Sequence, residues 1–529
     1  MSLIQFNRVY FQYDSSSIPV FNNLSISIDT VWKTGIVGRN GEGKTTLLNL
    51  IMGKIVPTKG KINVSMKTEY FPYEPKTILK TTLDVIKDSI APFYQWEEQM
   101  RQLLNNSNAS NLERYGEILE KYQDAGGYEI DALIEKEMYM MKMSSELLKR
   151  GFNTLSAGER TRVLIVSLFL KRGYFLLIDE PTNHLDLEGR KLLGEYLIQK
   201  SGFILVSHDR YLLDICVDHI LFINKKNVYI EKGNFSSWKH NRDIRKEFEK
   251  RKRKNLQKEI KSLKIAATKR RNWANNRESD KKIKTDQKER ADKGFVGHRA
   301  AKSMKRALNI EKRTESKIEE RKYLLNDFDK ERRLKLDVSA DLPQNILRLD
   351  HIFVSIKGKT IIKDFSLVMG REDRIAIVGK NGSGKTTLLN TVSDGVKIQR
   401  GKIYKPERLI ITRAYQNPLW NNGMLREHLI KCDIDETRFR NILGSLGVSG
   451  EVFGRPLETF SEGERKKVDL CRSFLTASDL LLWDEPLNYI DLITREQLED
   501  VILQYKPTLL FVEHDKHFVD RIATKVVYL

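Results

Sequence analysis

The stretch GRNGEGKTT, from Gly38 to Thr46, decides the fold, and it returns as GKNGSGKTT, from Gly379 to Thr387. Both copies have the spacing of a phosphate-binding loop, in which glycines let backbone N–H groups point at phosphates and a lysine neutralises their charge. The apolar runs TGIVG and IAIVG lead straight into the two loops, as buried strands do in such folds. The chain therefore contains two phosphate-binding modules.

The same landmarks follow each loop in the same order. In the first half they are LSAGE, LLIDEP and VSHD, at 155–159, 176–181 and 206–209. In the second half they are FSEGE, LLWDEP and VEHD, at 460–464, 481–486 and 512–515. Apolar β-runs alternate with helical patterns in both halves, which predicts a layered α/β fold with parallel core strands. A repeat of this length indicates two nucleotide-hydrolysing domains in tandem.

Composition narrows the class of protein. The chain has 529 residues, enough for two to four domains, and only three cysteines, which lie far apart in the sequence. They predict a reducing cytosolic setting without disulfides or iron–sulfur clusters. The sequence has no apolar run near the ~18–20 residues of a membrane span, and it begins on a strand-like segment rather than a signal peptide. We therefore expect a soluble, cytoplasmic protein.

The positive charge is concentrated in one segment. The whole chain carries a formal net charge of +21, and residues 239–335 alone contain 35 basic and 16 acidic residues, a net charge of +19. The remainder is nearly neutral. We expect a polyanionic partner (RNA, DNA or an anionic membrane surface) for this segment alone.

Three domains are predicted, at residues 1–237, 238–340 and 341–529. The first half carries 36 more residues than the second between its phosphate loop and its LSAGE element. We place this insertion at about residues 94–143, where the charged, helix-favouring pattern predicts a short helical hairpin. The alternative is a solvated elaboration without a partner.

The basic segment reads as two antiparallel helices, similar to a coiled coil, that join the modules. Leu256, Ile260, Leu263 and Ala267 have the spacing of a helix–helix seam. The seam lapses at residues 273–297, which we interpret as a polar tip. A charge run is usually a solvated face, but this density of cations favours contact with phosphates. The candidate RNA-binding residues are Trp273, Arg277, Lys281, Lys282, Lys284, Phe295, His298 and Arg299. Aromatic rings there could stack on bases, although a tryptophan such as Trp273 more often packs across the hairpin.

The repeated motifs predict two sites for ATP and Mg²⁺. The loop residues expected to bind ATP are Gly38, Arg39, Asn40, Gly41, Gly43, Lys44, Thr45 and Thr46 in the first half, and Gly379, Lys380, Asn381, Gly382, Ser383, Gly384, Lys385, Thr386 and Thr387 in the second. The hydroxyls of Thr45 and Thr386 suit Mg²⁺, as do Asp179 and Asp484 at the ends of apolar strands.

Catalytic roles are predicted for the residues that follow those strands. Glu180 and Glu485 are placed to polarise the attacking water, and His208 and His514 to contact the γ-phosphate and that water. The alternative readings are a helix-capping glutamate and a histidine buried in a turn. Their occurrence at matched positions in both halves favours catalysis.

The order of phosphate loop, LSAGE-type signature, apolar-Asp-Glu strand and histidine resembles the ATP-binding-cassette superfamily. Two cassettes on one chain, joined by a charged two-helix linker, resemble its ABC-F subgroup, and the match covers nearly the whole chain. The resemblance implies an ATPase whose cassettes pack head to tail, as a monomer, with two ATP molecules between them. It also implies that Ser461, Glu462 and Gly463 face the first phosphate loop. Ser156, Ala157 and Gly158 would face the second.

The two halves depart from the family pattern in different ways. Tyr13 fits the position that stacks on adenine, whereas its counterpart is Ile356. Gln416 suits a glutamine that contacts metal and water, but the first half has Tyr73 or Glu74 there. The bulky, charged Glu462 stands where the other signature has Ala157. We therefore expect unequal sites, with slower hydrolysis at the one that faces Ser461.

The resemblance also implies a partner. ABC-F proteins dock in the exit (E) site of the 70S ribosome, with the linker near the peptidyl-transferase centre, 23S rRNA and the P-site tRNA, and without a membrane or transmembrane partner. The tip sequence DKGFVGHRAAKSMKR resembles the branch that protects ribosomes from lincosamide, pleuromutilin and streptogramin A antibiotics. We favour protection over a housekeeping translation factor. A transporter ATPase leaves the basic segment unexplained. A DNA-associated cassette ATPase usually has zinc cysteine pairs or a much longer coiled coil.

Overall fold

The computed structural model describes residues 2–14, 18–75, 78–105, 109–183, 185–224, 228–283, 312–313, 316, 344–356, 358–380 and 382–529. The chain divides into two compact units, one made of Met1–Trp238 and Arg332–Leu529 and the other of Lys239–Glu331. The first unit contains both phosphate loops and hence both cassettes. The second contains most of the basic segment.

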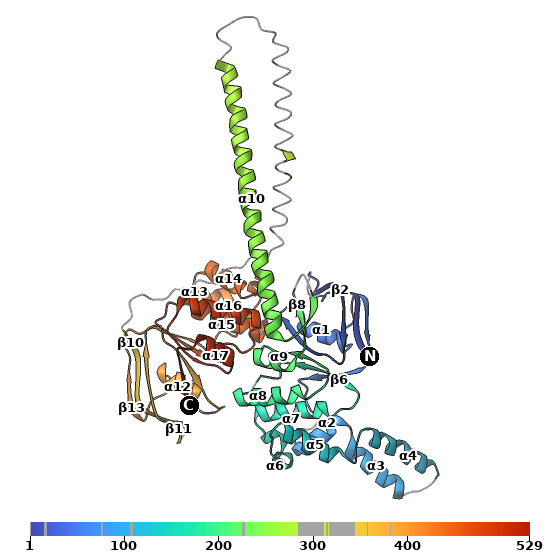
Figure 1. Ribbon diagram of the computed structural model, residues 1–529. Helices are drawn as coiled ribbons and strands as arrows, with labels where there is room; N and C mark the ends of the chain where they lie inside the picture. The colour runs from blue at the N-terminus through green and yellow to red at the C-terminus, as the bar shows by residue number, and fades with distance from the viewer. Residues whose placement is uncertain are drawn as a thin grey trace, which may run out of the picture. The chain divides into compact units, whose positions relative to one another are not determined.

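The first cassette has a six-stranded and a three-stranded sheet (Figure 1). Its strands are β1 (Leu3–Phe11), β2 (Phe21–Asp29), β3 (Lys33–Gly38), β4 (Lys59–Val64), β5 (Lys67–Phe71), β6 (Tyr174–Asp179), β7 (Phe203–Val206), β8 (His219–Ile223) and β9 (Val228–Lys232). Its helices are α1 (Lys44–Ile51), α2 (Thr82–Ile90), α3 (Phe93–Asn105), α4 (Ala109–Asp124), α5 (Ile130–Met140), α6 (Glu146–Lys149), α7 (Ala157–Phe169), α8 (Leu187–Ile198) and α9 (Arg210–Cys216).

The second cassette repeats this plan with a five-stranded and a three-stranded sheet. Its strands are β10 (Asn345–Ile356), β11 (Lys359–Gly370), β12 (Arg374–Val378), β13 (Arg400–Tyr404), β14 (Ile411–Ala414), β15 (Leu480–Asp484), β16 (Leu509–Val512) and β17 (Lys525–Tyr528). Its helices are α12 (Lys385–Val392), α13 (Leu425–Lys431), α14 (Glu436–Ser445), α15 (Glu462–Leu475), α16 (Leu492–Tyr505) and α17 (Lys516–Ile522).

The large sheets have the orders β5-β6-β7-β3-β8-β9 and β14-β15-β16-β12-β17. All neighbouring strands in them run parallel except the antiparallel pair β8 and β9. The predicted α/β class and the predicted parallel core strands are therefore confirmed. Because parallel strands end at the same edge, both phosphate loops, both Asp-Glu pairs and both histidines follow the carboxyl ends of neighbouring strands.

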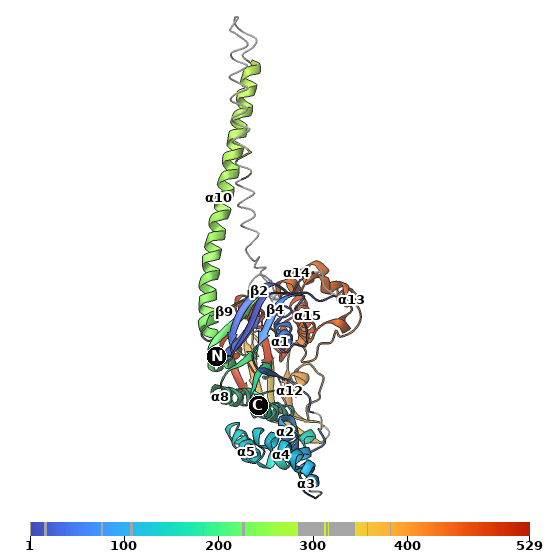
Figure 2. The same ribbon diagram turned by 90° about the vertical axis from the view of Figure 1, so that its right-hand side faces the viewer.

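Each small antiparallel sheet covers the helix that follows the phosphate loop. In the first cassette, α1 lies beside β2 and β4 in both views (Figures 1 and 2), and Leu47 and Leu48 of α1 share a core with Phe6 of β1. In the second cassette, Leu388 and Leu389 of α12 pack in the matching core. The apolar faces of α1 and α12 thus hold the loops against the sheets.

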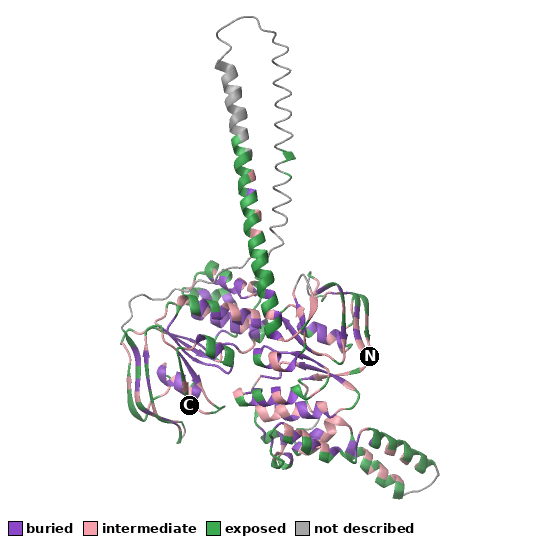
Figure 3. Cartoon of the chain, viewed as in Figure 1, coloured by how far each residue is buried: buried purple, intermediate pink, exposed green. Residues whose placement is uncertain are grey.

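The insertion of the first cassette contains the packed helices α3 and α4. Phe93 meets Tyr122 edge to face, with ring centroids 5.7 Å apart, and the Tyr122 hydroxyl donates to Glu97 Oε1 at 2.8 Å. Most residues of these two helices are exposed (Figure 3).

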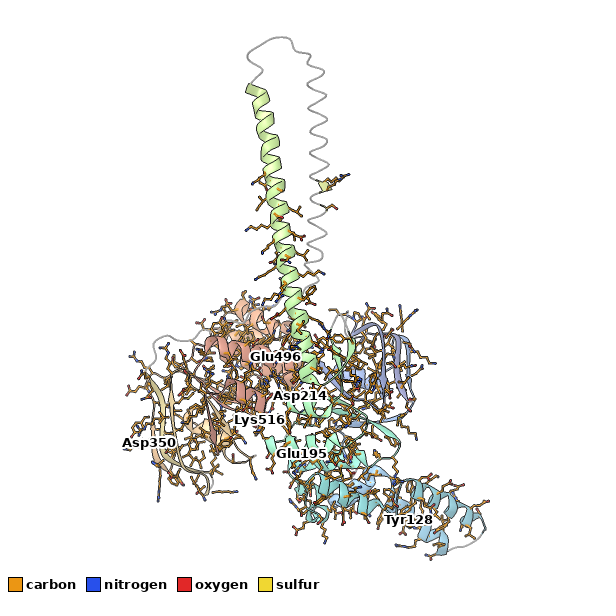
Figure 4. The ribbon with its side chains drawn as sticks, in the orientation of Figure 1. Tyr128, Glu195, Asp214, Asp350, Glu496 and Lys516 are labelled. Atoms are coloured by element: carbon orange, nitrogen blue, oxygen red, sulfur yellow. The ribbon has the colours of Figure 1, made fainter. Side chains whose placement is uncertain are left out.

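Helix α10 (Phe235–Ile283) begins in the first cassette and enters the basic segment. Phe235 and Trp238 are buried in the cassette core. Asp214 of α9 (Figure 4) accepts hydrogen bonds from the backbone N–H and the hydroxyl of Ser236, at 2.6 and 2.7 Å, and so caps the first turn.

Helix α10 continues to Ile283 and so includes the first part of the predicted polar tip. Lys, Arg, Glu and Ala favour a helix even without an apolar seam, and the first glycine of the segment is Gly294. The seam residue Ile260 is buried, as predicted. None of the helices within the described ranges is long and apolar enough to cross a membrane.

Candidate active sites

Glycines allow both phosphate loops to turn into their helices. Gly43 has φ +101°, and a Cβ there would lie 2.6 Å from Val20 Cγ1. Gly384 has φ +102°, and a Cβ there would lie 2.6 Å from Ile361 Cγ2. A residue with a side chain would be strained by both the backbone angle and the lack of space.

The lysine of each loop is buried against the loop itself. Lys44 Nζ donates to the carbonyl oxygen of Gly38 at 2.7 Å, and Lys385 Nζ donates to that of Gly379 at 2.8 Å. Burial lowers the pKa of both lysines, although nearby carboxylates oppose this. Both ammonium groups therefore lie within their own loops, where a lysine can neutralise the charge of a bound phosphate.

Glu180 and Glu485 share an unusual backbone conformation at the ends of β6 and β15. Their φ angles are +48° and +47°, in the left-handed region that a glutamate adopts at a cost of about 1–3 kcal/mol. The backbone N–H of Glu180 donates to Val206 O at 2.8 Å, and that of Glu485 donates to Val512 O at 3.0 Å. The neighbouring strands thus hold both turns in place.

Each glutamate also faces the histidine of its own cassette. His208 Nε2 lies 3.5 Å from Glu180 Oε1, and His514 Nε2 lies 3.5 Å from Glu485 Oε1. The structure thus brings together the four residues predicted to be catalytic, as two matching pairs.

The surroundings of the two glutamates differ. Glu485 Oε2 accepts hydrogen bonds from Asn488 Nδ2 at 2.7 Å and from Gln416 Nε2 at 2.9 Å. Burial raises the pKa of Glu485, but hydrogen bonds from His514, Asn488 and Gln416 outweigh it and hold the pKa at about 2. Burial and the charge of Asp179 raise the pKa of Glu180 to about 8. The second site thus contains the better-supported carboxylate.

The predicted metal-binding aspartates also have different partners. Asp484 Oδ1 accepts from Thr386 Oγ1 at 3.3 Å, and Asp484 Oδ2 pairs with Arg413 at 3.1 Å. Asp179 Oδ2 instead accepts from the Tyr70 hydroxyl at 2.9 Å, and Thr45 is exposed. A hydroxyl beside a carboxylate is the hard-oxygen donor set that suits Mg²⁺, so the second site fits this ion more completely.

Strand register identifies the first-half counterpart of Gln416. Tyr70 pairs with Leu177, and Arg413 pairs with Leu482, each two residues before the aspartate of its cassette. Tyr73, and not Glu74, is therefore the counterpart of Gln416. Its hydroxyl lies 2.5 Å from Ser167 Oγ on α7, so it is bound to this helix and not to Glu180.

The first phosphate loop meets the second cassette directly. Asn40 Nδ2 donates to Tyr489 O at 2.7 Å, and the backbone N–H of Asn40 donates to Asp491 Oδ2 at 3.3 Å. A Cβ on Gly463 would lie 2.7 Å from Asn40 Nδ2. The signature of the second cassette therefore lies against the phosphate loop of the first, as the family resemblance implies.

Described residues of the second loop also lie near the first cassette. Lys380 Nζ lies 3.8 Å from Glu188 Oε2, and the pKa of Lys385, which burial lowers, is raised in part by the charge of Asp186. Both carboxylates belong to the first turn of α8 or its cap, beyond the signature residues Ser156, Ala157 and Gly158. Asn381, the counterpart of Asn40, lies outside the described residues.

Both signature serines cap helices. Ser156 and Ser461 each accept a hydrogen bond from the backbone N–H three residues on, and the glutamate at that position bonds back to the serine N–H. This capping box follows from the Ser-x-x-Glu sequence and orients the N-termini of α7 and α15. Glu462 occupies the first position of α15, where a negative charge is favourable to the helix.

The structure describes the residue predicted to stack on adenine, but not the side chains of the residues predicted to bind RNA. The Tyr13 hydroxyl lies 3.0 Å from Thr46 Oγ1, which holds this half-exposed ring beside the first loop, and Ile356 is also half-exposed. The RNA-binding candidates Trp273, Arg277, Lys281 and Lys282 are on α10, but their side chains lie outside the described part of the structure. Lys284, Phe295, His298 and Arg299 lie wholly outside it.

Sequence reasoning missed several residues around the sites. Asp491 is fully buried and accepts from Lys467 Nζ at 2.8 Å, and Tyr70 and Arg413 hold the two aspartates. The repeated Asp-Leu of residues 186–187 and 491–492 was a signal that would have identified Asp491. Tyr70 and Arg413 are unlike residues, so comparison of the two halves could not have found them.

Both cassettes match a known protein family. Residues 21–183 and 362–488 match the family model described as ABC transporter. The chain therefore belongs to the ABC transporter family, and it is an ATPase with two ATP-binding cassettes in tandem.

Several curated relatives span almost the whole chain. The ATP-binding protein YdiF of Bacillus subtilis is 28% identical and covers 100% of this chain and 80% of its own length. The energy-dependent translational throttle protein EttA of Mycobacterium tuberculosis is 26% identical, over 96% of this chain and 88% of its own. The ribosome protection protein VmlR of Bacillus subtilis is 25% identical, over 96% and 84%.

Among solved structures, the fold resembles an archaeal ribosome recycling factor, aABCE1, crystallised with the ribosomal stalk protein aP1. The TM-score is 0.58 at 16% identity, and the match covers 98% of this chain and 87% of that one. This likeness supports the tandem-cassette fold.

We expect Gly463→Ala to lower steady-state ATPase activity about tenfold, because overpacking by one methyl costs about 1–3 kcal/mol where the signature meets Asn40. Alanine favours a helix over glycine, so the melting temperature should not fall. The matched control is Gly454→Ala, since a Cβ there meets no neighbour within 4 Å. Equal activity of the two variants would contradict the contact.

We expect Glu485→Gln to lower the single-turnover rate of ATP hydrolysis about 100-fold, and Glu180→Gln less than about tenfold. The reason is that Gln416 and Asn488 orient Glu485, whereas Tyr73 is bound to α7. Each variant is the other's control, because both make the same chemical change. Identical losses would count against unequal sites.

Proposed function

We propose that this ATPase binds the ribosome as a clamp that ATP closes and hydrolysis opens. The observation that carries the proposal is the contact of Gly463 and Asp491 with the first phosphate loop, because it joins the cassettes across a nucleotide site. ATP favours the closed form only if it binds that form more tightly than the open one. Contacts to both cassettes supply this difference in affinity.

The predicted site residues have specific roles in this proposal. Lys44 and Lys385 bind the γ-phosphates, Glu180 and Glu485 accept a proton from the attacking water, and His208 and His514 orient it. Thr386 and Asp484 would hold Mg²⁺ in the second site, with Gln416 beside them, and Thr45 and Asp179 in the first. The ion neutralises charge on the phosphates and lowers the barrier to phosphoryl transfer. Ser461 and Gly463 complete the first site, and Ser156 and Gly158 complete the second.

The basic segment supplies the contact with ribosomal RNA. It holds a net charge of +19, and most described residues of α10 are exposed. A helix of 49 residues is about 70 Å long at a rise of 1.5 Å per residue. That length suits a reach from the E site to the peptidyl-transferase centre, 23S rRNA and the P-site tRNA.

We further propose that the reach protects the ribosome from antibiotics that bind near that centre. The likeness to VmlR, which is named a ribosome protection protein, supports this choice, as does the tip sequence of the linker. The second candidate is a housekeeping translation factor, which the likeness to EttA supports. The two candidates share the clamp and differ in what the linker does.

We expect a double variant, Glu180→Gln with Glu485→Gln, to co-sediment with 70S ribosomes in ATP, because it closes without hydrolysis. The unchanged chain should dissociate as it hydrolyses ATP, and the double variant should dissociate when ADP replaces ATP. Failure of the double variant to co-sediment at near-physiological salt would contradict the clamp.

We expect the purified chain to restore in vitro translation stalled by a lincosamide or a pleuromutilin. Replacing Lys250, Arg251, Lys252 and Lys254 of α10 with Gln should weaken this rescue, because each lost phosphate contact lowers salt-dependent affinity. The control replaces four exposed lysines of the first cassette, Lys54, Lys59, Lys61 and Lys67, with Gln and makes the same change in charge. An effect seen only without drug would support the housekeeping candidate instead.

A further inference from the structure

A buried lysine connects the signature helix of the second cassette to its own catalytic strand. Lys466, in the second turn of α15, is only 1% exposed. Its Nζ donates to Tyr415 O at 2.6 Å, to Gln416 O at 3.3 Å and to Asp484 O at 3.3 Å. An ammonium group has three N–H donors, and all three find backbone acceptors here.

Two further residues of α15 reinforce this connection one and two turns later. Asp469 Oδ2 accepts from the backbone N–H of Tyr415 at 2.9 Å. Arg472 donates to Arg413 O and pairs with Asp469 at 2.7 Å. We call Lys466, Asp469 and Arg472 the charged clamp. It ties α15 to residues 413–416 through the backbone, so the helix and that segment must shift together.

The charged clamp of α15 joins residues that belong to different ATP sites. The N-terminus of α15 carries Gly463, which lies against the first phosphate loop. The other end of the connection is Gln416, which bonds Glu485 in the second site. A change at Glu485 or Gln416 therefore displaces the signature that completes the first site.

Among the described residues, the first cassette has only uncharged side chains at the matching positions. Thr161, Leu164 and Ser167 replace the three charged residues. Thr161 Oγ1 donates to Ala157 O of its own helix at 3.1 Å, and Ser167 Oγ meets the Tyr73 hydroxyl. One hydroxyl pair thus connects α7 to Tyr73, whereas the charged residues of α15 form hydrogen bonds to four backbone carbonyls.

We propose that Lys466 is a positioning residue that couples the two ATP sites, so that occupation of the second site aligns the signature that completes the first. The coupling acts in both directions for binding, as linkage requires, but it runs through α15 and not through α7. This inference rests on the proposed pair of ATP sites.

The test measures ATP binding by calorimetry in the full-length chain with both glutamates intact, and it uses a non-hydrolysable ATP analogue as the probe. We expect two analogue molecules per chain, with one site raising the affinity of the other about tenfold, within the usual range of such couplings. Lys466→Met should keep the stoichiometry of two and reduce this factor to about one. Lys466→Gln, which retains two N–H donors, should restore part of it.

The matched control is Thr161→Val at the equivalent position of α7, which should leave the coupling factor unchanged. If Lys466→Met does not fold, Asp469→Asn provides a second disruption of the charged clamp. It should also lower the coupling factor. An unchanged factor in either folded clamp variant, or an equal loss in Thr161→Val, would overturn the role of Lys466. Fewer than two analogue molecules in the chain with intact Lys466 would overturn the proposed pair of sites itself.

Discussion

The interface between the two cassettes depends on pairing buried charges, because an unpaired charge is costly to bury. Asp491 and Glu499 are fully buried, and each is paired with a cation there. Lys467 pairs with Asp491 at 2.8 Å, and Arg210 of the first cassette pairs with Glu499 of the second at 2.9 Å. Separation of the cassettes would break the Arg210 pair, while Glu499 would keep its pair with Arg521 of its own cassette, so the Arg210 pair favours the closed arrangement.

The same constraint accounts for the inequality of the two sites. Each catalytic strand ends in two neighbouring carboxylates that repel each other when both are charged. In the second site, Arg413, Gln416 and Asn488 offset this repulsion with hydrogen bonds and charge. In the first site, Tyr70 provides one hydrogen bond, and burial raises the pKa of Glu180. A duplicated motif therefore supports two different chemical environments.

These differences give the proposed cycle a direction. In the second cassette, Lys466 connects the catalytic strand to the signature helix α15, which lies against the first site. Helix α7 has Thr161, Leu164 and Ser167 in place of the three charged residues of α15. Helix α9 adds a separate link, because it carries Arg210 at the interface and Asp214 at the cap of α10. The interface between the cassettes and the first turn of α10 thus share one short helix.

The sequence by itself determined the two phosphate loops, the parallel strands that feed them and the two Glu–His pairs, because each depends on local patterns that occur twice. It also determined where the positive charge lies. Only the tertiary structure decided which further residues surround these motifs, since Tyr70, Arg413 and Lys466 come from segments far apart in sequence. It also decided that Tyr73 turns away to α7, and that α10 runs past residue 273 to Ile283. The burial of a side chain and its hydrogen-bond partners depend on how segments pack together, so they cannot be predicted from one segment alone.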